Sequence, residues 1–156
     1  MDITYKIVGL KKLQKATNEA PGQFFARNAL AMQSSVDLVE RLLIGETPEG
    51  PGHFGYHERE RWSARVRVGP RRVVGVVANS SPQARWREVG TKAHDIMPKK
   101  GSVLKIGDQY VAIVHHPGAK ARHSTKKALA ASKGAIKVFF TDAARGVLQN
   151  MATSGD

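Results

Sequence analysis

The sequence predicts an α+β protein in which an antiparallel sheet of about four strands packs against a long N-terminal helix and a C-terminal helix, with long extended loops. Three observations support this prediction: a long helical stripe in the first third of the chain, paired short strands in the middle, and a helical pattern at the end. The 156 residues suit a single domain spanning residues 1–156. The chain is 41% hydrophobic but only 6% aromatic, which predicts a mainly aliphatic core.

The N-terminal third of the chain is predicted to be helical in two parts. Residues 8–16 form a short first helix, and Pro21-Gly22 interrupts the helical pattern. Residues 23–44 form the clearest helix, because apolar side chains recur at alternating intervals of four and three residues and therefore lie on one stripe. The stripe comprises Phe25, Ala29, Met32, Val36, Val39 and Leu43. Such a stripe packs on the chain's own sheet, which is the commoner outcome, or on a helix of another chain.

The middle of the chain is predicted to alternate loops with short strands. Residues 45–60 are rich in glycine and proline and form a long loop. Residues 62–68 alternate apolar with basic or small polar side chains, which is typical of a half-buried strand with a basic outer face. Residues 73–78 form the partner strand across a turn, and residues 84–89 form one helical turn.

The last third of the chain combines a second hairpin with a C-terminal helix. Residues 103–106 and 109–115 flank Gly107-Asp108, a pair typical of a tight β-turn. A helix begins at a cap formed by Ser124 or Thr125 and runs to about Asn150. The side chains expected on its packed side are Leu129, Ile136, Phe140, Ala143 and Val147. Residues 151–156 are expected to fray.

The net charge of +12 arises entirely in residues 51–156. Residues 1–50 contain six Lys or Arg and six Asp or Glu, whereas residues 51–156 contain nineteen and seven. A positive field of this kind favours a polyanion or an acidic protein surface, and a solvated basic face is the alternative. The chain has no cysteine, no apolar run long enough to span a membrane, and no signal-peptide core near its start. We therefore expect a soluble protein, made in a cytoplasm, with no membrane partner.

The sequence contains no recognisable catalytic or metal-binding constellation. Among the histidines, His53 and His57 lie in the glycine-rich loop, whereas His115 and His116 are adjacent and would point to opposite faces of a strand. No serine lies in a Gly-x-Ser-x-Gly turn, and no phosphate-binding glycine loop is present. We therefore expect no enzyme, no catalytic residue, no metal and no cofactor. A histidine-metal hydrolase is the third hypothesis for function.

The arginines of the first hairpin are candidates for contact with DNA. They are Arg65, Arg67, Arg71 and Arg72. Phosphate contact needs only such charges, whereas base readout needs aromatic platforms or a helix that enters a groove, and neither pattern is visible. A basic nucleic-acid-binding accessory protein is therefore one alternative for function, and exposure to DNA inside a larger assembly is another.

The second half of the chain resembles a family of phage proteins. Residues 88–96 read EVGTKAHDI, Pro98-Lys99-Lys100 and Leu104 follow, and residues 116–121 read HPGAKA. This order is similar to the tail-completion and head–tail joining proteins of long-tailed phages, which read E-x-G-T-x-x-H-x-I-x-P-K, then a hairpin, then H-P-G-[TA]-K-A and a long C-terminal helix. The chain departs from the family at residues 122–129, which read RHSTKKAL in place of P-F-L-R-x-A-L. Residues 45–60 also lack the family's short T-G-x-L-x-x-S link.

The resemblance implies a structural role rather than an enzymatic one. Members of the family are ring-forming subunits, commonly hexameric, at the head–tail junction or upper tail of the virion, and they bind no cofactor. The implied partners are further copies of the chain, the adjacent head-completion or connector proteins, and the tail-terminator or tail-tube proteins. Genomic DNA would pass through the lumen of such a ring.

The residues that carry the resemblance are expected to shape loops that contact a neighbouring subunit. Gly90 lets the backbone leave the preceding turn, Thr91 bonds a nearby backbone group, and Pro98 fixes an extended exit. His94 and His116 are expected to donate hydrogen bonds that fix these loops. Ring formation requires protruding, ordered contacts, whereas ordinary turn chemistry within one subunit is the alternative. The predicted interface residues are Glu88, Gly90, Thr91, His94, Pro98, Lys99, Lys100, His116, Pro117 and Gly118.

Overall fold

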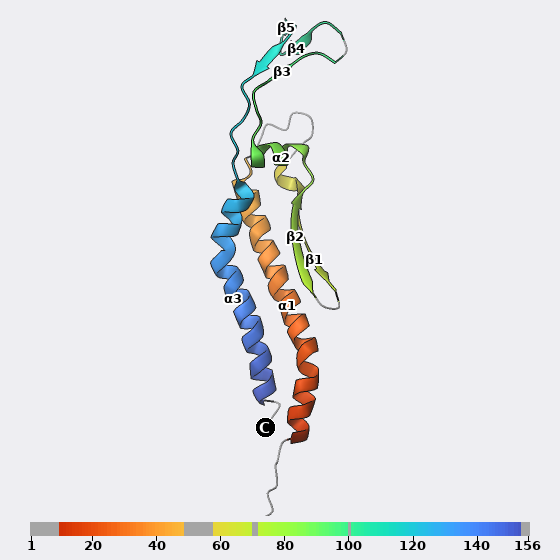
Figure 1. Ribbon diagram of the computed structural model, residues 1–156, viewed down its shortest axis with the longest axis vertical. Helices are drawn as coiled ribbons and strands as arrows, with labels where there is room; N and C mark the ends of the chain where they lie inside the picture. The colour runs from red at the N-terminus through yellow and green to blue at the C-terminus, as the bar shows by residue number, and fades with distance from the viewer. Residues whose placement is uncertain (1–9, 49–57, 70–71, 100, 154–156) are drawn as a thin grey trace, which may run out of the picture.

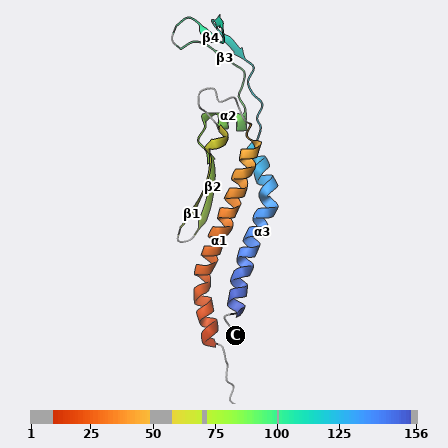
Figure 2. The same ribbon diagram turned by 180° about the vertical axis from the view of Figure 1, so that it is seen from behind.

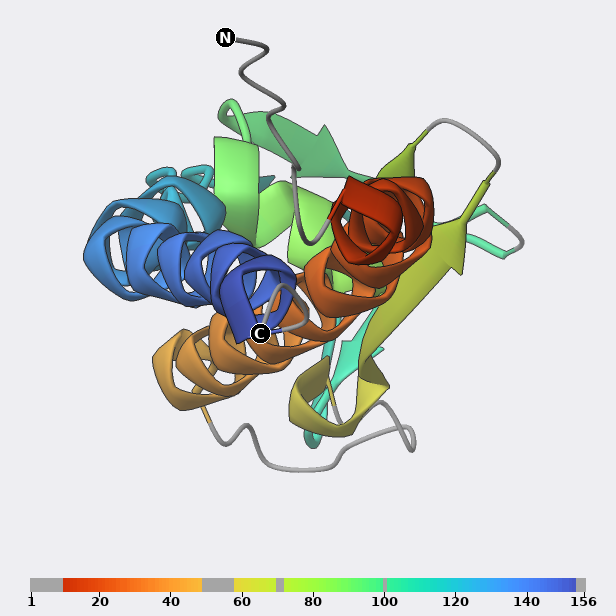
Figure 3. The same ribbon diagram turned by 90° about the horizontal axis from the view of Figure 1, so that it is seen from below.

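The computed structural model describes residues 10–48, 58–69, 72–99 and 101–153, which form an elongated body and a projecting arm (Figure 1). In the body, two long helices lie side by side in opposite directions, and a β-hairpin lies along the first of them. These elements are α1 (Leu10–Glu46), α3 (Ser124–Thr153), and the hairpin of β1 (Trp62–Val68) and β2 (Val73–Asn79). Seen from below, α1 lies between α3 and the hairpin (Figure 3).

The arm extends beyond the ends of α1 and α3 in both side views (Figures 1 and 2). It comprises residues 91–119 and follows the short helix α2 (Pro82–Val89). Two antiparallel ladders run along it: β3 (His94–Ile96) pairs with β6 (Val114–His116), and β4 (Leu104–Ile106) pairs with β5 (Gln109–Val111). The chain therefore leaves the body after α2 and returns to it at the start of α3.

The α+β class is confirmed, but the predicted sheet of about four strands is wrong. Within the described residues the strands form three separate two-stranded pairs. The predicted strand 109–115 is divided, because β5 pairs with β4 whereas β6 pairs with β3. β3 lies in a stretch without period-2 alternation, since all three of its side chains are exposed and no buried face selects apolar residues.

The predicted break at Pro21-Gly22 is also wrong, because α1 continues through both residues. A proline inside a helix removes one backbone hydrogen bond and costs about 3 kcal/mol. Packing of α1 against α3 offsets this cost, and the contact between the two helices extends nearly to the proline. There, Asn150 of α3 donates a hydrogen bond to the Gln23 side chain at 3.2 Å. Pro21 itself is exposed.

The core lies where α1, the hairpin and α3 meet. The predicted stripe on α1 is confirmed in its second half, because Val36, Val39 and Leu43 are buried. Val39 and Leu43 form one buried cluster with Ala128 of α3, and Trp62, Val77 and Ile136 pack against it. Gly75 brings β2 close to α1, since a Cβ at this position would lie 2.4 Å from Val36 Cγ1 and 2.7 Å from Met32 Sδ.

The face that α3 turns toward α1 consists mainly of small side chains. Ala128, Ser132, Ala143 and Val147 are buried there, which allows the two helices to approach closely. The C-terminal helix is confirmed, although it ends at Thr153 rather than at about Asn150. The predicted packing of Leu129 is wrong: its side chain is 55% exposed, whereas the neighbouring Ala128 is buried in the core cluster with Val39 and Leu43.

Hydrogen bonds tie the end of α1 to the start of β1. Thr47 donates from its hydroxyl to the Leu43 carbonyl at 2.7 Å, and the Trp62 indole donates to the Thr47 hydroxyl oxygen at 2.9 Å. Arg59 donates to the Ile44 carbonyl at 3.1 Å, so carbonyls of the last turn of α1 gain partners. Residues 49–57 of the predicted loop lie outside the described residues, as do His53 and His57. None of the described helices has the length and apolar character needed to cross a bilayer.

Candidate functional site

Two glycines and one backbone pair form the base of the arm. Thr91 and Ala119 exchange two backbone hydrogen bonds, of 2.9 Å and 3.1 Å, between the outgoing and returning segments. Gly90 and Gly118 flank this pair with φ of 75° and 83°. A Cβ at Gly118 would lie 2.4 Å from the Thr91 carbonyl oxygen, and one at Gly90 would lie 2.6 Å from the Ala119 carbonyl oxygen. The two glycines therefore allow the segments to meet at backbone contact distance.

Glu88 ties α2 to α3 and lies at the foot of the arm rather than on it. Its carboxylate accepts a hydrogen bond from the Thr125 amide at 3.2 Å and a second from the Thr125 hydroxyl. An anionic acceptor at this position satisfies a free amide of the first turn and complements the helix dipole. The α3 cap predicted from Ser124 or Thr125 is therefore supplied by Glu88 from outside the helix. Among the predicted interface residues, Glu88 is placed to act within its own subunit.

The β3–β6 ladder places its histidines in two different environments. His94 and His116 are cross-strand partners whose rings stack with centroids 5.0 Å apart. His115 lies opposite Asp95, with 2.6 Å between Nδ1 and Oδ1. The prediction that His115 and His116 point to opposite faces is confirmed. Among the described residues, no group of three or more His, Cys, Asp or Glu side chains is placed to hold a metal ion.

The hydrogen bonds of His94 and His116 fix the two segments of the arm in different ways. His94 donates from Nδ1 to the Lys92 carbonyl at 2.9 Å, as predicted for a loop-fixing donor. His116 instead accepts at Nδ1 the amide hydrogen of Gly118 at 3.0 Å, so its predicted donor role is wrong. Because the backbone turns at Gly118, the amide rather than a carbonyl faces the ring. The neutral His116 ring therefore carries its proton on Nε2.

The far end of the arm exposes apolar side chains. Met97, Ile106 and Tyr110 are 62%, 53% and 66% exposed. Val103 and Ile113 are also exposed, so apolar side chains are spread over the whole tip of the arm. Of the other predicted interface residues, Pro98 is half-buried, Lys99 and Pro117 are exposed, and Lys100 lies outside the described residues.

Basic residues gather on two surfaces of the body. Arg65 and Arg67 are exposed on the outer face of the β1–β2 hairpin, opposite Val76 and Val74, and Arg72 is exposed beside the turn. Arg71 lies outside the described residues. The second surface was not predicted as a DNA contact: Lys126, Lys133 and Lys137 are exposed at intervals of seven and four on α3 and therefore share one stripe.

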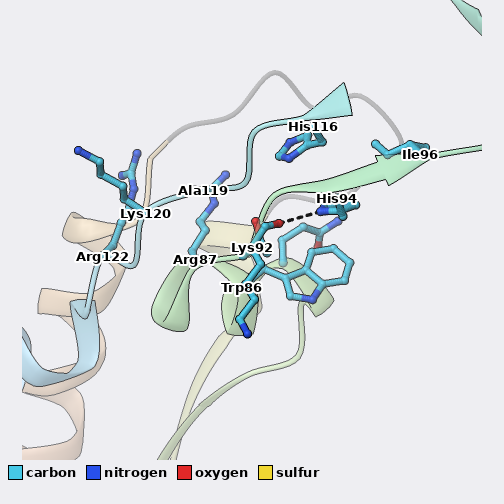
Figure 4. Close-up of a pocket in the computed structure, with 11 residues that line it drawn as sticks. Trp86, Arg87, Lys92, His94, Ile96, His116, Ala119, Lys120 and Arg122 are labelled. Atoms are coloured by element: carbon cyan, nitrogen blue, oxygen red, sulfur yellow. Dashed lines mark hydrogen bonds between the residues drawn. The ribbon is translucent and has the colours of Figure 1, made fainter. Parts of the chain in front are cut away.

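A groove of about 820 Å³ lies at the base of the arm, between α2 and the two arm segments (Figure 4). We call it the arm-base groove. Its lining residues are Gln83, Trp86, Arg87, Thr91, Lys92, His94, Ile96, His116, Ala119, Lys120 and Arg122. Thr91, His94 and His116 were predicted as site residues, whereas the others were not. One feature of the sequence could have indicated the basic residues of the groove: the segment between Asp108 and Asp142 contains six Lys or Arg and no acidic residue.

Comparison with models of protein families, with curated proteins and with solved structures finds no match to this chain in any of the three.

Proposed function

We propose that this chain is a non-enzymatic structural subunit of a homo-oligomeric ring at the head–tail junction or upper tail of a phage. The projecting arm is the observation that carries this proposal. Further copies of the chain, six in a ring, are its first partners. Head-completion or connector proteins on one side and tail-terminator or tail-tube proteins on the other complete the set, and DNA passes through the lumen.

The balance of buried and exposed apolar side chains supports assembly with other chains. Among the described residues, sixteen large hydrophobic side chains are exposed. The buried hydrophobic core of the same residues comprises only Ala31, Val36, Val39, Leu43, Ala128, Ala143 and Val147. A subunit with so little core gains further stability when partners cover its surface.

The arm has the properties required of a ring contact. It is anchored at its base by the Thr91–Ala119 pair and by Gly90 and Gly118, so it projects in a defined direction. Its tip exposes apolar side chains that gain free energy when another chain covers them. A projecting element of one subunit that meets a different surface of the next makes a head-to-tail contact, which closes a ring when the rotation permits.

Native mass spectrometry and negative-stain imaging of the purified chain, alone and mixed with head-completion and tail-tube proteins, test this proposal. Tyr110→Asp and Ile106→Asp are expected to abolish assembly, because each places a charge on an apolar contact while leaving the monomer folded. Leu148→Asp is the matched control, since Leu148 is also 66% exposed but lies on the far half of α3. A parent protein that stays monomeric at high concentration and binds none of these components would refute the proposal.

A basic nucleic-acid-binding accessory protein is the second candidate function. Arg65, Arg67 and Arg72 support it, because they are exposed and none forms an ion pair with a described carboxylate. Fluorescence anisotropy of labelled duplex DNA at several salt concentrations tests it. Replacing all three by alanine should lower the slope of log K against log salt by about 2 to 3 if each contacts a phosphate. An unchanged slope would count against the arginine face.

A further inference from the structure

We propose that the arm-base groove binds an acidic peptide segment of a partner protein, with a bulky apolar side chain of that segment as its anchor. This inference goes beyond ring formation, because it assigns a partner of defined chemistry to the groove. All residues that line the groove belong to one copy of the chain. Four properties of the groove support it: its charge, its apolar wall, its unpartnered polar atoms and its shape.

The charge of the groove selects an anionic partner. Arg87, Lys92, Lys120 and Arg122 line it, and its described lining includes no carboxylate. Arg87 has its own counter-ion in Glu58, with 3.1 Å between Nε and Oε2, so the other three cations dominate the field. Several cations that line one groove raise the local concentration of an anionic segment and steer its approach.

The wall between these cations is apolar. Trp86 is 55% exposed on α2, and Ile96 on β3 is 39% exposed. Figure 4 shows the Trp86 indole close to Lys92 and His94, with Ile96 and His116 farther along the arm. A large exposed aromatic side chain beside cations is typical of an interface anchor, because it gains apolar contact at a low cost in side-chain entropy.

Two polar atoms of the groove residues lack partners. Thr91 Oγ1 and Arg87 Nη1 are buried without a hydrogen-bond partner. A buried polar group without a hydrogen-bond partner is unfavourable, so a rearrangement that gives it an acceptor or donor is favoured. His116 adds a donor, because its Nδ1 accepts the Gly118 amide and its Nε2 therefore carries the proton. A carboxylate supplies the acceptor oxygen that the His116 Nε2–H requires.

The arrangement favours a peptide over a nucleic acid. Phosphates of a nucleic acid form a continuous line of charge, which suits an open track such as the lysine stripe of α3. The arm-base groove instead combines four cations with the apolar side chains of Trp86 and Ile96 in a hollow of about 820 Å³. A peptide places carboxylates and one large apolar side chain at matching intervals, and it fills such a pocket with its anchor.

The experiment uses the full chain and a dye-labelled synthetic peptide with a central leucine flanked by glutamates, followed by fluorescence anisotropy. Saturable binding is expected. It should weaken roughly tenfold or more when the flanking glutamates become glutamines, and by a similar factor when the leucine becomes glycine. The variants Trp86→Ala and Lys120→Ala/Arg122→Ala should each weaken binding roughly tenfold, because the side chains removed are exposed and their loss leaves the fold intact.

The matched control is Lys133→Ala/Lys137→Ala, which removes the same charge from α3 outside the groove. It should change the affinity by less than about twofold. Absence of saturable binding would overturn the proposal. Equal loss in the control variant would also overturn it, because the attraction would then be general. A single-stranded oligothymidylate that displaces the peptide, binds more tightly and depends on the same groove residues would reassign the groove to nucleic acid.

Discussion

Replacing Gly118 by alanine is expected to detach the two segments of the arm from each other while the helices of the body stay folded. The φ of 83° lies in the left-handed region, where an alanine costs about 1–2 kcal/mol. The new Cβ would also lie 2.4 Å from the Thr91 carbonyl oxygen and 2.9 Å from the Ala93 amide nitrogen. These are backbone atoms, so no side-chain rotation relieves the contact, and the segments must separate.

The separation removes the two hydrogen bonds between Thr91 and Ala119, each worth about 0.5–1.5 kcal/mol. Together with the backbone strain, the local free energy of opening should fall by about 3 kcal/mol, which corresponds to roughly a hundredfold faster hydrogen exchange. The amides of Thr91 and Ala119 report this change. Circular dichroism should show nearly unchanged helix content and melting temperature, because neither residue belongs to the core.

Gly107→Ala is the matched control, because Gly107 also has a positive φ, of 59°, but a Cβ there meets no atom within 4 Å. Gly107→Ala introduces the backbone strain without the close contact, and the strain is confined to the turn between β4 and β5. Exchange at Thr91 and Ala119 should therefore stay at the parent rate in this control. Equal exchange rates in Gly118→Ala and Gly107→Ala would refute the role assigned to close backbone contact at the base of the arm.

The other predictions concern the body and are read by thermal or urea unfolding. Glu88→Ala should lower the free energy of unfolding by about 1–2 kcal/mol and the melting temperature by roughly 2–6 °C, because the substitution removes the cap of α3. Glu60 is exposed, so Glu60→Ala should change the free energy of unfolding by less than about 0.5 kcal/mol. Gly75→Ala should lower the free energy of unfolding by about 1–3 kcal/mol, because the new Cβ would lie 2.4 Å from Val36 Cγ1. An unchanged free energy of unfolding would contradict the close approach of β2 to α1. Gly22→Ala should raise the free energy of unfolding by about 0.5–1 kcal/mol, because Gly22 lies exposed in α1 and a Cβ there would have no atom within 4 Å. A lower free energy of unfolding in this variant would contradict a continuous helix at Gly22.

The elements of the body could be predicted because each has one buried face. The stripe on α1 recurs every three or four residues where it packs on the hairpin and on α3. The residues of β1 alternate because Trp62 and Val66 face α1 whereas Arg65 and Arg67 face solvent. α2 begins earlier than predicted, at Pro82, because Ser81 caps it and proline fits the first helical position.

The arm could not be predicted in the same way, because no buried face selects its residues. β3 is fully exposed, and its strand conformation depends on pairing with β6, about twenty positions later in the chain. The contact of the motif residues with a neighbouring subunit stays a prediction, and the roles of two of them within the chain differ from those expected. Glu88 caps a helix and His116 accepts a hydrogen bond, and both roles depend on partners that only the folded chain brings near.

By itself, the sequence determined the periodic helices, the first hairpin, the concentration of charge after residue 50 and the positions of the two glycine-containing motifs. The tertiary structure alone decided that α1 passes through Pro21, that the strands pair separately, and that Trp86, Lys92 and Arg122 line one groove. The physical reason is that periodicity records a local choice between a buried and an exposed face. Contacts between distant segments depend instead on backbone approach and packing, which no single stretch of the chain specifies.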